Sequence, residues 1–194
     1  MAKLVGFLGG PCTGKTTLAT AVFNALTEQG QNIAWASEFV TDDIQLNGPP
    51  HLDYYIYEQY RFLFHQSRRE ENALKEAPLV LTDSPLLIGY AYTLLEKEKA
   101  VKGRQKHFIR EVEALFARDK HRYEQLYLLQ REAGFEDNGI RFHSEEESVA
   151  FDAFLKNMLL EHKIPFKEVS GDVPTRTEFV LNDLQQTQGV KRPA

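Results

Sequence analysis

The chain of 194 residues is 42% hydrophobic and 26% charged, a composition typical of a soluble globular protein with one α/β domain. Its formal net charge of −5 disfavours sequence-independent binding to nucleic acid, and no apolar segment approaches the ~18–20 residues of a membrane span. The single cysteine, Cys12, excludes an internal disulfide. We therefore expect a reducing, cytoplasmic location, and no signal peptide because a strand candidate starts almost at once.

Residues 9–16 read Gly-Gly-Pro-Cys-Thr-Gly-Lys-Thr, which matches the phosphate-binding pattern G-x-x-x-x-G-K-[ST]. The apolar segment 3–8 before it predicts a strand, and the amphipathic segment 15–29 after it predicts a helix that Gly30 closes. Strand, loop and helix in this order are the context in which the pattern binds phosphate. A chance match on a glycine-rich turn is the alternative, and both flanking elements argue against it.

Strand and helix candidates continue to alternate along the chain. Strands are predicted over 32–37, 79–83, 123–129 and 164–169, and helices over 52–76, 85–97, 102–121, 145–162 and 174–188. Turn and breaker residues predict a loop over 40–51. Ser144 with Glu147 forms a capping box before the helix over 145–162, the segment 131–144 has no apolar period and predicts a loop, and 189–194 is expected to fray.

This alternation predicts an α/β protein with a P-loop NTPase fold: a five-stranded, mainly parallel sheet flanked by helices on both faces, with a lid loop. We interpret residues 1–194 as a single domain of this kind, with the lid at about 131–144.

In the phosphate loop, glycines let the backbone curl so that successive N–H groups face inward, and the following helix N-terminus completes an anion site. Lys15 is expected to reach the β- and γ-phosphates, and Thr16 to ligate Mg²⁺, so ATP and Mg²⁺ are the predicted cofactors. The residues expected to bind the nucleotide are Gly9, Pro11, Cys12, Thr13, Gly14, Lys15, Thr16 and Thr17. Cys12 is expected to contribute only its backbone.

Asp83 ends an apolar strand, which predicts a carboxylate at the carboxyl edge of the sheet, beside the phosphate loop. An acid there can hold Mg²⁺ through water or take a proton from an attacking hydroxyl. The alternative is a surface acid that caps the helix begun by Ser84 and Pro85.

Glu38 follows the second predicted strand at the same edge, directly before Phe39. A carboxylate beside an aromatic ring can activate a substrate hydroxyl while the ring stacks on the substrate. A solvated loop acid is the alternative for Glu38, and it is the preferred interpretation for Asp42 and Asp43.

Arg131 and Arg141 flank the predicted lid. Phosphoryl transfer spreads charge over the phosphate oxygens, so an arginine that closes over them lowers the barrier. Small kinases carry a lid at this place, after the fourth strand and before a helix. The alternative is that both arginines only solvate the loop, and His143 is interpreted as a bystander.

The helix over 52–76 carries aromatic residues on every face, and their spacing favours ordinary core packing. The alternative is that Tyr54, Tyr57 or Arg61 lines a ring pocket for the substrate with Phe39. Basic clusters at 102–106 and 118–122 are interspersed with acids and are predicted to be solvated helix faces.

With these residues the chain resembles the P-loop kinases of the NadR type, whose kinase domain phosphorylates nicotinamide riboside. The resemblance covers most of the chain and rests on the phosphate loop, the segment Trp35–Val40, the strand Val80–Asp83, and the segments 126–129, 137–141 and 164–166. It implies a kinase fold and kinase activity. In contrast to that type, we expect no fused adenylyltransferase or DNA-binding domain. Ser84-Pro85 after the strand resembles nucleoside and nucleotide kinases more generally.

The leading hypothesis is an ATP- and Mg²⁺-dependent kinase that transfers the γ-phosphate to a hydroxyl or phosphate of a small nucleoside- or nucleotide-like substrate. Its predicted catalytic residues are Lys15, Asp83, Glu38, Arg131 and Arg141, and its predicted metal ligands are Thr16 and Asp83. A second hypothesis is a kinase of a modified base within DNA, such as 5-hydroxymethyluracil, which the net charge disfavours. A third is an ATP-binding regulatory protein that transfers nothing. A GTPase is excluded because no Asn-Lys-x-Asp guanine reader occurs.

Overall fold

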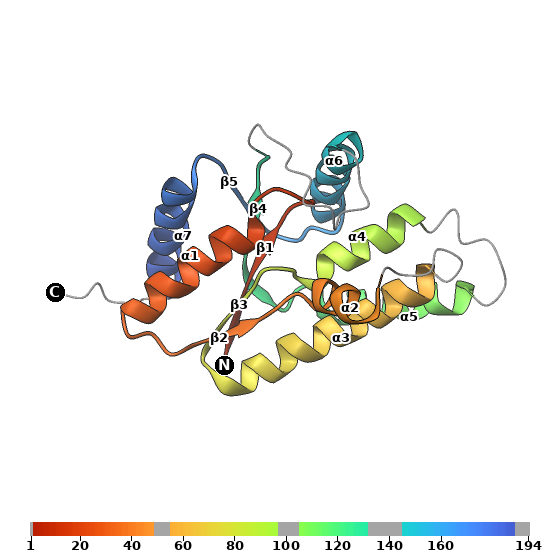
Figure 1. Cartoon of the computed structure of the whole chain (residues 1–194), viewed down its shortest axis with the longest axis horizontal. Helices are drawn as coiled ribbons and strands as arrows, with labels where there is room; N and C mark the ends of the chain where they lie inside the picture. The colour runs from red at the N-terminus through yellow and green to blue at the C-terminus, as the bar shows by residue number, and fades with distance from the viewer. Residues whose placement is uncertain (1, 49–54, 97–104, 132–144, 189–194) are drawn as a thin grey trace.

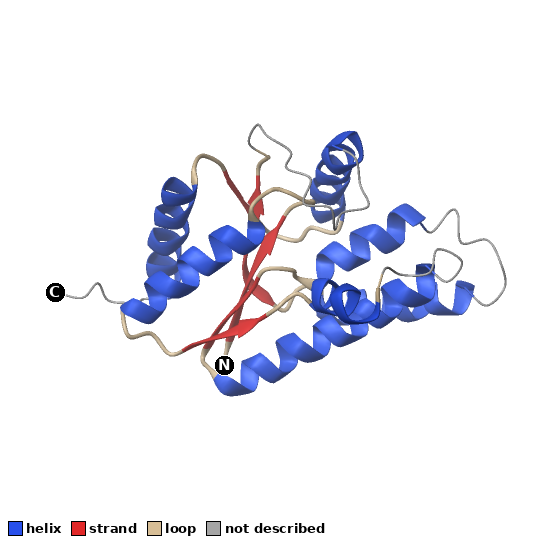
Figure 2. Ribbon diagram, in the orientation of Figure 1, coloured by secondary structure: helices blue, strands red, loops and turns tan. Residues whose placement is uncertain are grey.

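The structure, a computed structural model, describes residues 2–48, 55–96, 105–131 and 145–188 (Figure 1). In chain order its elements are β1 (Lys3–Leu8), α1 (Lys15–Glu28), β2 (Ile33–Ala36), α2 (Phe39–Asn47), α3 (Tyr55–Glu76), β3 (Leu79–Thr82), α4 (Leu86–Glu96), α5 (Gln105–Asp119), β4 (Tyr123–Leu129), α6 (Glu145–Glu161), β5 (Lys167–Val169) and α7 (Val173–Gln188). Figure 2 shows the strands at the centre and the helices around them. None of the described helices is both long and apolar enough to cross a membrane.

The five strands form one sheet in the order β2-β3-β1-β4-β5, and every pairing is parallel. The predicted α/β fold with a five-stranded sheet is therefore confirmed. β1 lies in the middle, between β3 and β4. Because parallel strands share one carboxyl edge, the segments that follow β1, β2, β3 and β4 gather at that edge. The strand order reverses at β1: β2 and β3 lie on one side of it, and β4 and β5 lie on the other. Ligands of open α/β sheets bind at such a switch point.

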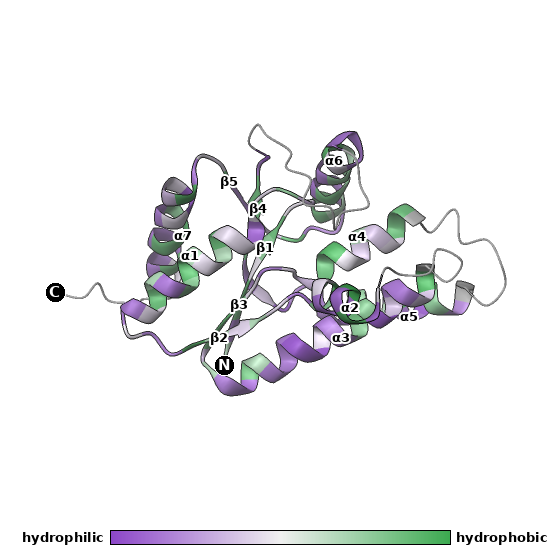
Figure 3. Cartoon of the chain, viewed as in Figure 1, coloured by the Kyte–Doolittle hydropathy of each residue, from purple (hydrophilic) through white to green (hydrophobic). Residues whose placement is uncertain are grey.

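Alternate residues of β1 point to opposite faces of the sheet and belong to two hydrophobic cores. Leu4 and Leu8 pack with residues of α3, α4, α5 and α6, whereas Val5 and Phe7 pack with residues of α1 and α7. Figure 1 shows the corresponding layers, with α1 and α7 on one side of the sheet and the remaining helices on the other. In Figure 3 the helices that cover the sheet carry hydrophobic and hydrophilic residues side by side, as expected for helices with one buried face.

The segment predicted as a loop over 40–51 begins instead with a helix, α2, over Phe39–Asn47. The breakers in this segment end the helix rather than prevent it. Gly48 has a φ of 81°, and its N–H donates a hydrogen bond to the carbonyl of Ile44 over 2.9 Å, which satisfies one orphan carbonyl of the last turn.

The interpretation of Asp42 and Asp43 as solvated loop acids is wrong for Asp43, and Asp42, although its side chain is 47% exposed, lies in a helix; both pair with arginines of α3. Asp43 is buried and accepts a hydrogen bond from Nη1 of Arg61 over 2.7 Å, and Asp42 accepts one from Nη1 of Arg69 over 2.6 Å. The hydrogen bond from Arg61 holds the pKa of the Asp43 carboxyl below its ordinary value. These two pairs dock α2 on α3.

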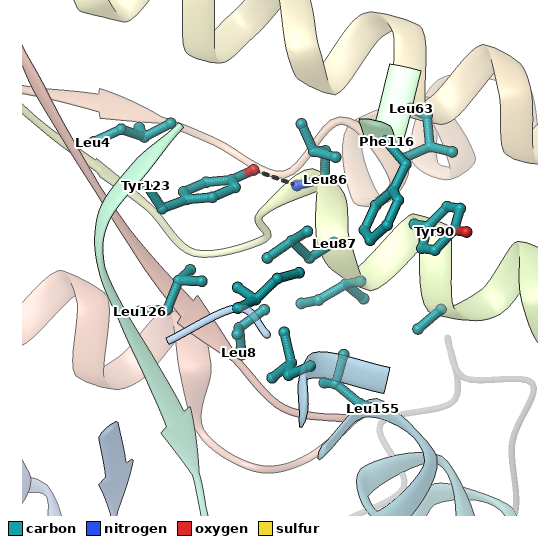
Figure 4. Close-up of a cluster of buried hydrophobic side chains, with 14 of the residues drawn as sticks. Leu4, Leu8, Leu63, Leu86, Leu87, Tyr90, Phe116, Tyr123, Leu126 and Leu155 are labelled. Atoms are coloured by element: carbon teal, nitrogen blue, oxygen red, sulfur yellow. Dashed lines mark hydrogen bonds between the residues drawn. The ribbon is translucent and has the colours of Figure 1, made fainter. Parts of the chain in front are cut away.

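In the basic cluster at 118–122, Arg118 is exposed, as predicted for a solvated face, but Arg122 is not. Arg122 lies 2.7 Å from the carboxylate of Glu70, which is fully buried on α3. Burial raises the pKa of Glu70 to about 7, against the attraction of Arg122. Tyr123 donates a hydrogen bond to Glu70 over 3.1 Å and accepts one from the backbone N–H of Leu86 over 2.9 Å (Figure 4). This network fixes the start of α4, next to the end of β3.

Two smaller differences concern element ends. β5 covers Lys167–Val169 rather than 164–169, because Ile164 lies in the turn that closes the C-terminus of α6, where its N–H donates to the carbonyl of Leu159 over 2.9 Å. The basic cluster at 102–106, Ser144 of the predicted capping box and most of the predicted lid lie outside the part of the chain whose side chains are described.

Candidate active site

The loop between β1 and α1 has positive φ angles at three positions, the first of which is Gly9 with a φ of 149°. Gly14, directly before α1, has a φ of 85°, which glycine tolerates at little cost. Cys12 has a φ of 65°, which is uncommon for a residue with a side chain and typical of strained functional loops. The hydroxyl of Thr13 donates to the carbonyl of Gly10 over 3.0 Å and closes the turn from inside. The loop therefore has a fixed, curled backbone at the start of a helix.

Lys15 and Thr16 open α1 at the mouth of this loop. Nζ of Lys15 donates a hydrogen bond to the carbonyl of Gly10 over 2.9 Å, so the ammonium group lies against the loop. The hydroxyl of Thr16 donates to Oδ2 of Asp83 over 3.0 Å. Thr16 and Asp83, the two predicted metal ligands, are thus brought together by the parallel pairing of β1 with β3.

Asp83 is buried, with 6% of its surface exposed, and its Oδ1 has no hydrogen-bond partner among the described residues. Burial, together with the nearby charge of Glu38, raises the pKa of Asp83 to about 6, although the Thr16 hydrogen bond and Lys15 lower it. A buried carboxylate oxygen without a partner is costly unless a ligand or ion satisfies it. Asp83 therefore has the properties of a ligand-binding acid rather than of a solvated helix cap.

Glu38 lies next to Asp83 but is held by different groups. It is the N-cap residue of α2, and its Oε1 accepts a hydrogen bond from the hydroxyl of Ser84 over 2.9 Å. Its Oε2 accepts one from the hydroxyl of Thr41. Ser84 follows Asp83 directly, so the hydrogen bond from Ser84 holds the carboxylate of Glu38 beside the turn that carries Asp83. Asp83 faces the phosphate loop through Thr16, and Glu38 lies on the side of α2.

Two of the predicted substrate-pocket residues lie together, because the guanidinium carbon of Arg61 is 5.8 Å from the ring centroid of Phe39. The ring of Phe39 stacks on His65, with centroids 4.5 Å apart, and its N–H donates to Oε1 of Gln66 over 2.8 Å. Arg61 is taken up by its ion pairs with Asp43 and Glu58, so it holds α2 in place. Tyr57 is 41% exposed and packs edge-on against Phe108 of α5. Tyr54 lies outside the described residues.

The buried Gln66 was not predicted as a site residue. It joins the start of α2 to the end of β3, because its Nε2 also approaches the hydroxyl of Thr82 at 3.4 Å. A glutamine within a long helix gives no sequence signal for such a role, since its partners come from two other elements.

Arg131, at the end of the described part of the lid, forms an ion pair with Asp152 of α6. Nε of Arg131 lies 2.9 Å and Nη2 lies 2.7 Å from Oδ2 of Asp152. The other carboxylate oxygen of Asp152 accepts the backbone N–H of Gly10 in the phosphate loop over 2.6 Å. Arg131 is therefore attached to the phosphate loop. Arg141 lies outside the described residues.

Arg176 of α7 is a second arginine at the loop, and sequence reasoning missed it. It is buried, and it donates to the carbonyl of Thr13 over 2.9 Å and to the carbonyl of Gln130 over 2.8 Å. It thus bridges the phosphate loop and the residue before Arg131. No group of three or more His, Cys, Asp or Glu side chains that could hold a metal ion occurs in the described part of the chain.

A family model described as an AAA domain (AAA_28) matches residues 4–176. The chain belongs to this AAA-domain family. A comparison with curated protein sequences finds no match. The family match covers β1 from Leu4 onward, the phosphate loop and Asp83, and it ends at Arg176.

Several solved structures share the fold. A crystal structure of NadR protein in complex with NR has a TM-score of 0.78 at 17% identity, and one in complex with NAD and AMP-PNP has a TM-score of 0.74 at 16% identity. Both alignments cover 100% of this chain, which spans 53% and 51% of those chains. Deoxyadenosine kinase from M. mycoides, with products dCMP and dCDP, has a TM-score of 0.67 at 15% identity over 94% of this chain and 99% of that chain. The predicted resemblance to P-loop kinases of the NadR type is confirmed as a likeness of fold, and the chain spans about half of the NadR chain.

Proposed function

We propose that this protein is an ATP- and Mg²⁺-dependent kinase that transfers the γ-phosphate to a hydroxyl or phosphate of a small nucleoside- or nucleotide-like substrate. The observation that carries the proposal is the pair of acids at the loop, Asp83 bonded to Thr16 and Glu38 bonded to Ser84. Asp83 can then bind a metal ion, while Glu38 remains available as a general base for the acceptor. The fold likeness to proteins solved with AMP-PNP, NR and dCMP supports the same class of ligands.

On the nucleotide side, the curled loop and the N-terminus of α1 suit a triphosphate. Lys15 lies against the loop and would exchange its contact with the Gly10 carbonyl for phosphate oxygens. The backbone of residues 9–17 would supply N–H donors, as predicted from the sequence.

Thr16 and Asp83 fit a bound Mg²⁺, because they offer a hydroxyl and a carboxylate and because Oδ1 of Asp83 is buried without a partner. The remaining ligands of such an ion would be phosphate oxygens and water, in keeping with the absence of a larger acidic cluster among the described side chains. Bound there, Mg²⁺ would neutralise charge on the phosphates.

On the acceptor side, we assign the role of general base to Glu38. Its carboxylate would take the proton of the acceptor hydroxyl while the acceptor oxygen bonds to the γ-phosphorus. The bond from the γ-phosphorus to the β–γ bridging oxygen breaks, and ADP leaves with that oxygen. Asp83 is less suited to this role because its carboxylate faces Thr16 at the phosphate loop, where it would hold Mg²⁺. Arg131 would stabilise charge on the transferred group, and Arg141 remains a predicted second arginine of the lid.

The test is transfer of label from γ-labelled ATP to a panel of nucleosides, nucleotides, NR and DNA with modified bases. We expect transfer to one of the small acceptors. Glu38→Gln should lower the transfer rate by about 10²- to 10⁴-fold and leave nucleotide affinity nearly unchanged, the usual range for loss of a general base. Glu28→Gln, which changes an exposed acid at the end of α1, is the matched control.

The alternatives have distinct outcomes in the same screen. Transfer only to DNA, with a steep fall in rate at higher salt, would indicate a kinase of modified bases. Hydrolysis that no acceptor alters, and that Glu38→Gln leaves unchanged, would indicate a regulatory ATPase and would overturn the proposal.

A further inference from the structure

The carboxylate of Asp152 connects two parts of the site that are far apart in sequence. Its Oδ1 accepts the backbone N–H of Gly10 over 2.6 Å, across 142 positions. Its Oδ2 accepts Nε of Arg131 over 2.9 Å and lies 2.7 Å from Nη2. One side chain of α6 therefore holds both the phosphate loop and the arginine that follows β4.

The position of Asp152 is fixed by the buried face of α6. Its neighbour Phe151 is 2% exposed and stacks on Tyr92 of α4, with ring centroids 4.1 Å apart. Leu155, one turn later, is fully buried in the core that also contains Leu8 of β1 (Figure 4). Asp152 is thus presented to the loop by a helix that is packed into the core.

Arg131 lies close to the phosphate loop as a consequence. A Cβ placed on Gly10 would be 3.2 Å from Nη2 of Arg131 and 2.6 Å from Oδ1 of Asp152, so the ion pair covers this glycine. The Arg131 side chain is 14% exposed, and its Nη1 is buried without a hydrogen-bond partner among the described residues. The guanidinium group keeps an unused donor at a loop that is shaped for phosphate.

We propose that Asp152 is a positioning residue for phosphoryl transfer, which holds Arg131 at the phosphate loop before the nucleotide arrives. The proposal rests on the kinase function proposed above. An unrestrained arginine loses rotamer entropy when it is fixed on a phosphate. Because Asp152 already fixes Arg131 in the folded protein, this entropy is lost on folding, and Arg131 stabilises the transition state without a further ordering cost.

The test compares Asp152→Asn, Arg131→Gln and the double variant in steady-state phosphoryl transfer. The amide keeps the shape of Asp152 and removes its charge. We expect Asp152→Asn to lower kcat by about 10- to 100-fold and to change KM for ATP by less than about 3-fold, because the lost interaction acts on the transferring group. In the Arg131→Gln background, Asp152→Asn should lower kcat by less than about 2-fold, since it acts through the arginine.

Lys156→Gln is the matched control, because it removes the ion pair of Lys156 with Glu168, 2.8 Å long, from the same helix. It should leave kcat unchanged. If Asp152→Asn does not fold, Gly10→Ala replaces it, since the added methyl displaces the carboxylate by contact and leaves both charges in place. Gly10→Ala should then lower kcat as Asp152→Asn would.

The outcomes separate the two proposals. An active wild-type enzyme with Asp152→Asn at or above its kcat overturns the positioning role alone. Effects of Asp152→Asn and Arg131→Gln that multiply in the double variant do the same, because they show independent action. A wild-type protein that transfers phosphate to no acceptor overturns the kinase function, and the positioning role with it.

Discussion

The carboxylate of Asp83 accepts a hydrogen bond from the hydroxyl of Thr16 over 3.0 Å, although 67 positions separate the two residues. Thr16 belongs to the first turn of α1, and Asp83 follows β3, the strand next to β1. Their contact leaves Oδ1 of Asp83 buried and without a partner among the described residues. A buried acid of this kind lowers the free energy of unfolding, and proteins keep such residues where function requires them.

The first prediction concerns this cost. The pKa of Asp83 is about 6 in the folded protein and near 3.8 in the unfolded chain, so between these values the folded state binds more protons. The free energy of unfolding should therefore fall as pH rises from about 4 to about 6, by about 3 kcal/mol in all. Asp83→Asn should remove this fall and be more stable than wild type at pH 7.5. Urea denaturation of nucleotide-free protein in EDTA measures both effects.

Activity should change in the opposite direction. Asp83→Asn is expected to lower Mg²⁺-dependent nucleotide affinity while it raises stability. An Asp83→Asn protein with the same pH dependence of stability as wild type would show that Asp83 is not the group responsible.

The second prediction concerns the close approach of β1 to the turn that carries both acids. A Cβ on Gly6 would lie 2.5 Å from Cγ of Pro85 and 2.8 Å from Cδ2 of Leu126. Gly6→Ala should therefore displace Pro85, at a cost of about 1–3 kcal/mol in the free energy of unfolding. Because Pro85 follows Asp83 and Ser84, the transfer rate should fall as well. Unchanged stability and rate would mean that the turn moves freely.

The sequence predicted the sheet, the phosphate loop and the edge at which Asp83 and Glu38 lie, because these follow from local patterns and from the geometry of parallel strands. It did not predict α2, because Gly48 and the two prolines after it look the same whether they end a helix or fill a loop. The difference depends on the ion pairs that α2 makes with α3.

The roles of Gln66, Asp152 and Arg176 could not be predicted from the sequence for a similar reason. Each side chain binds backbone groups of distant elements: the N–H of Phe39, the N–H of Gly10 and the carbonyl of Thr13. Backbone atoms have no residue identity, so the sequence contains no pattern that pairs them with these side chains. Only the packing of the helices brings them together.

The third prediction concerns the docking of α2, whose N-cap is Glu38. Asp43 is 6% exposed and Arg61 is 27% exposed in their ion pair. Asp43→Asn or Arg61→Met should each lower the free energy of unfolding by about 1–3 kcal/mol, below the range for fully buried pairs because solvent screens the arginine. The double variant should lose less than the sum, with a coupling of about 0.5–3 kcal/mol. Additive losses in urea denaturation would show that the pair does not act as a unit.

The fourth prediction concerns Arg176, which joins the carbonyl of Thr13 to that of Gln130. Arg176→Lys keeps the charge but offers one nitrogen in place of two separated amino groups, so it cannot reach both carbonyls. The carbonyl left without a donor costs about 1–3 kcal/mol in the free energy of unfolding.

Because Thr13 belongs to the phosphate loop, Arg176→Lys should also weaken nucleotide binding, by about 10-fold if the cost in binding is about 1.4 kcal/mol. Isothermal titration with ADP measures this change, and Glu178→Gln, an exposed neighbour on α7, is the control. Loss of stability with unchanged ADP affinity would mean that Arg176 supports the fold and not the loop. Loss of affinity without loss of stability would mean that Arg176 contacts the nucleotide itself.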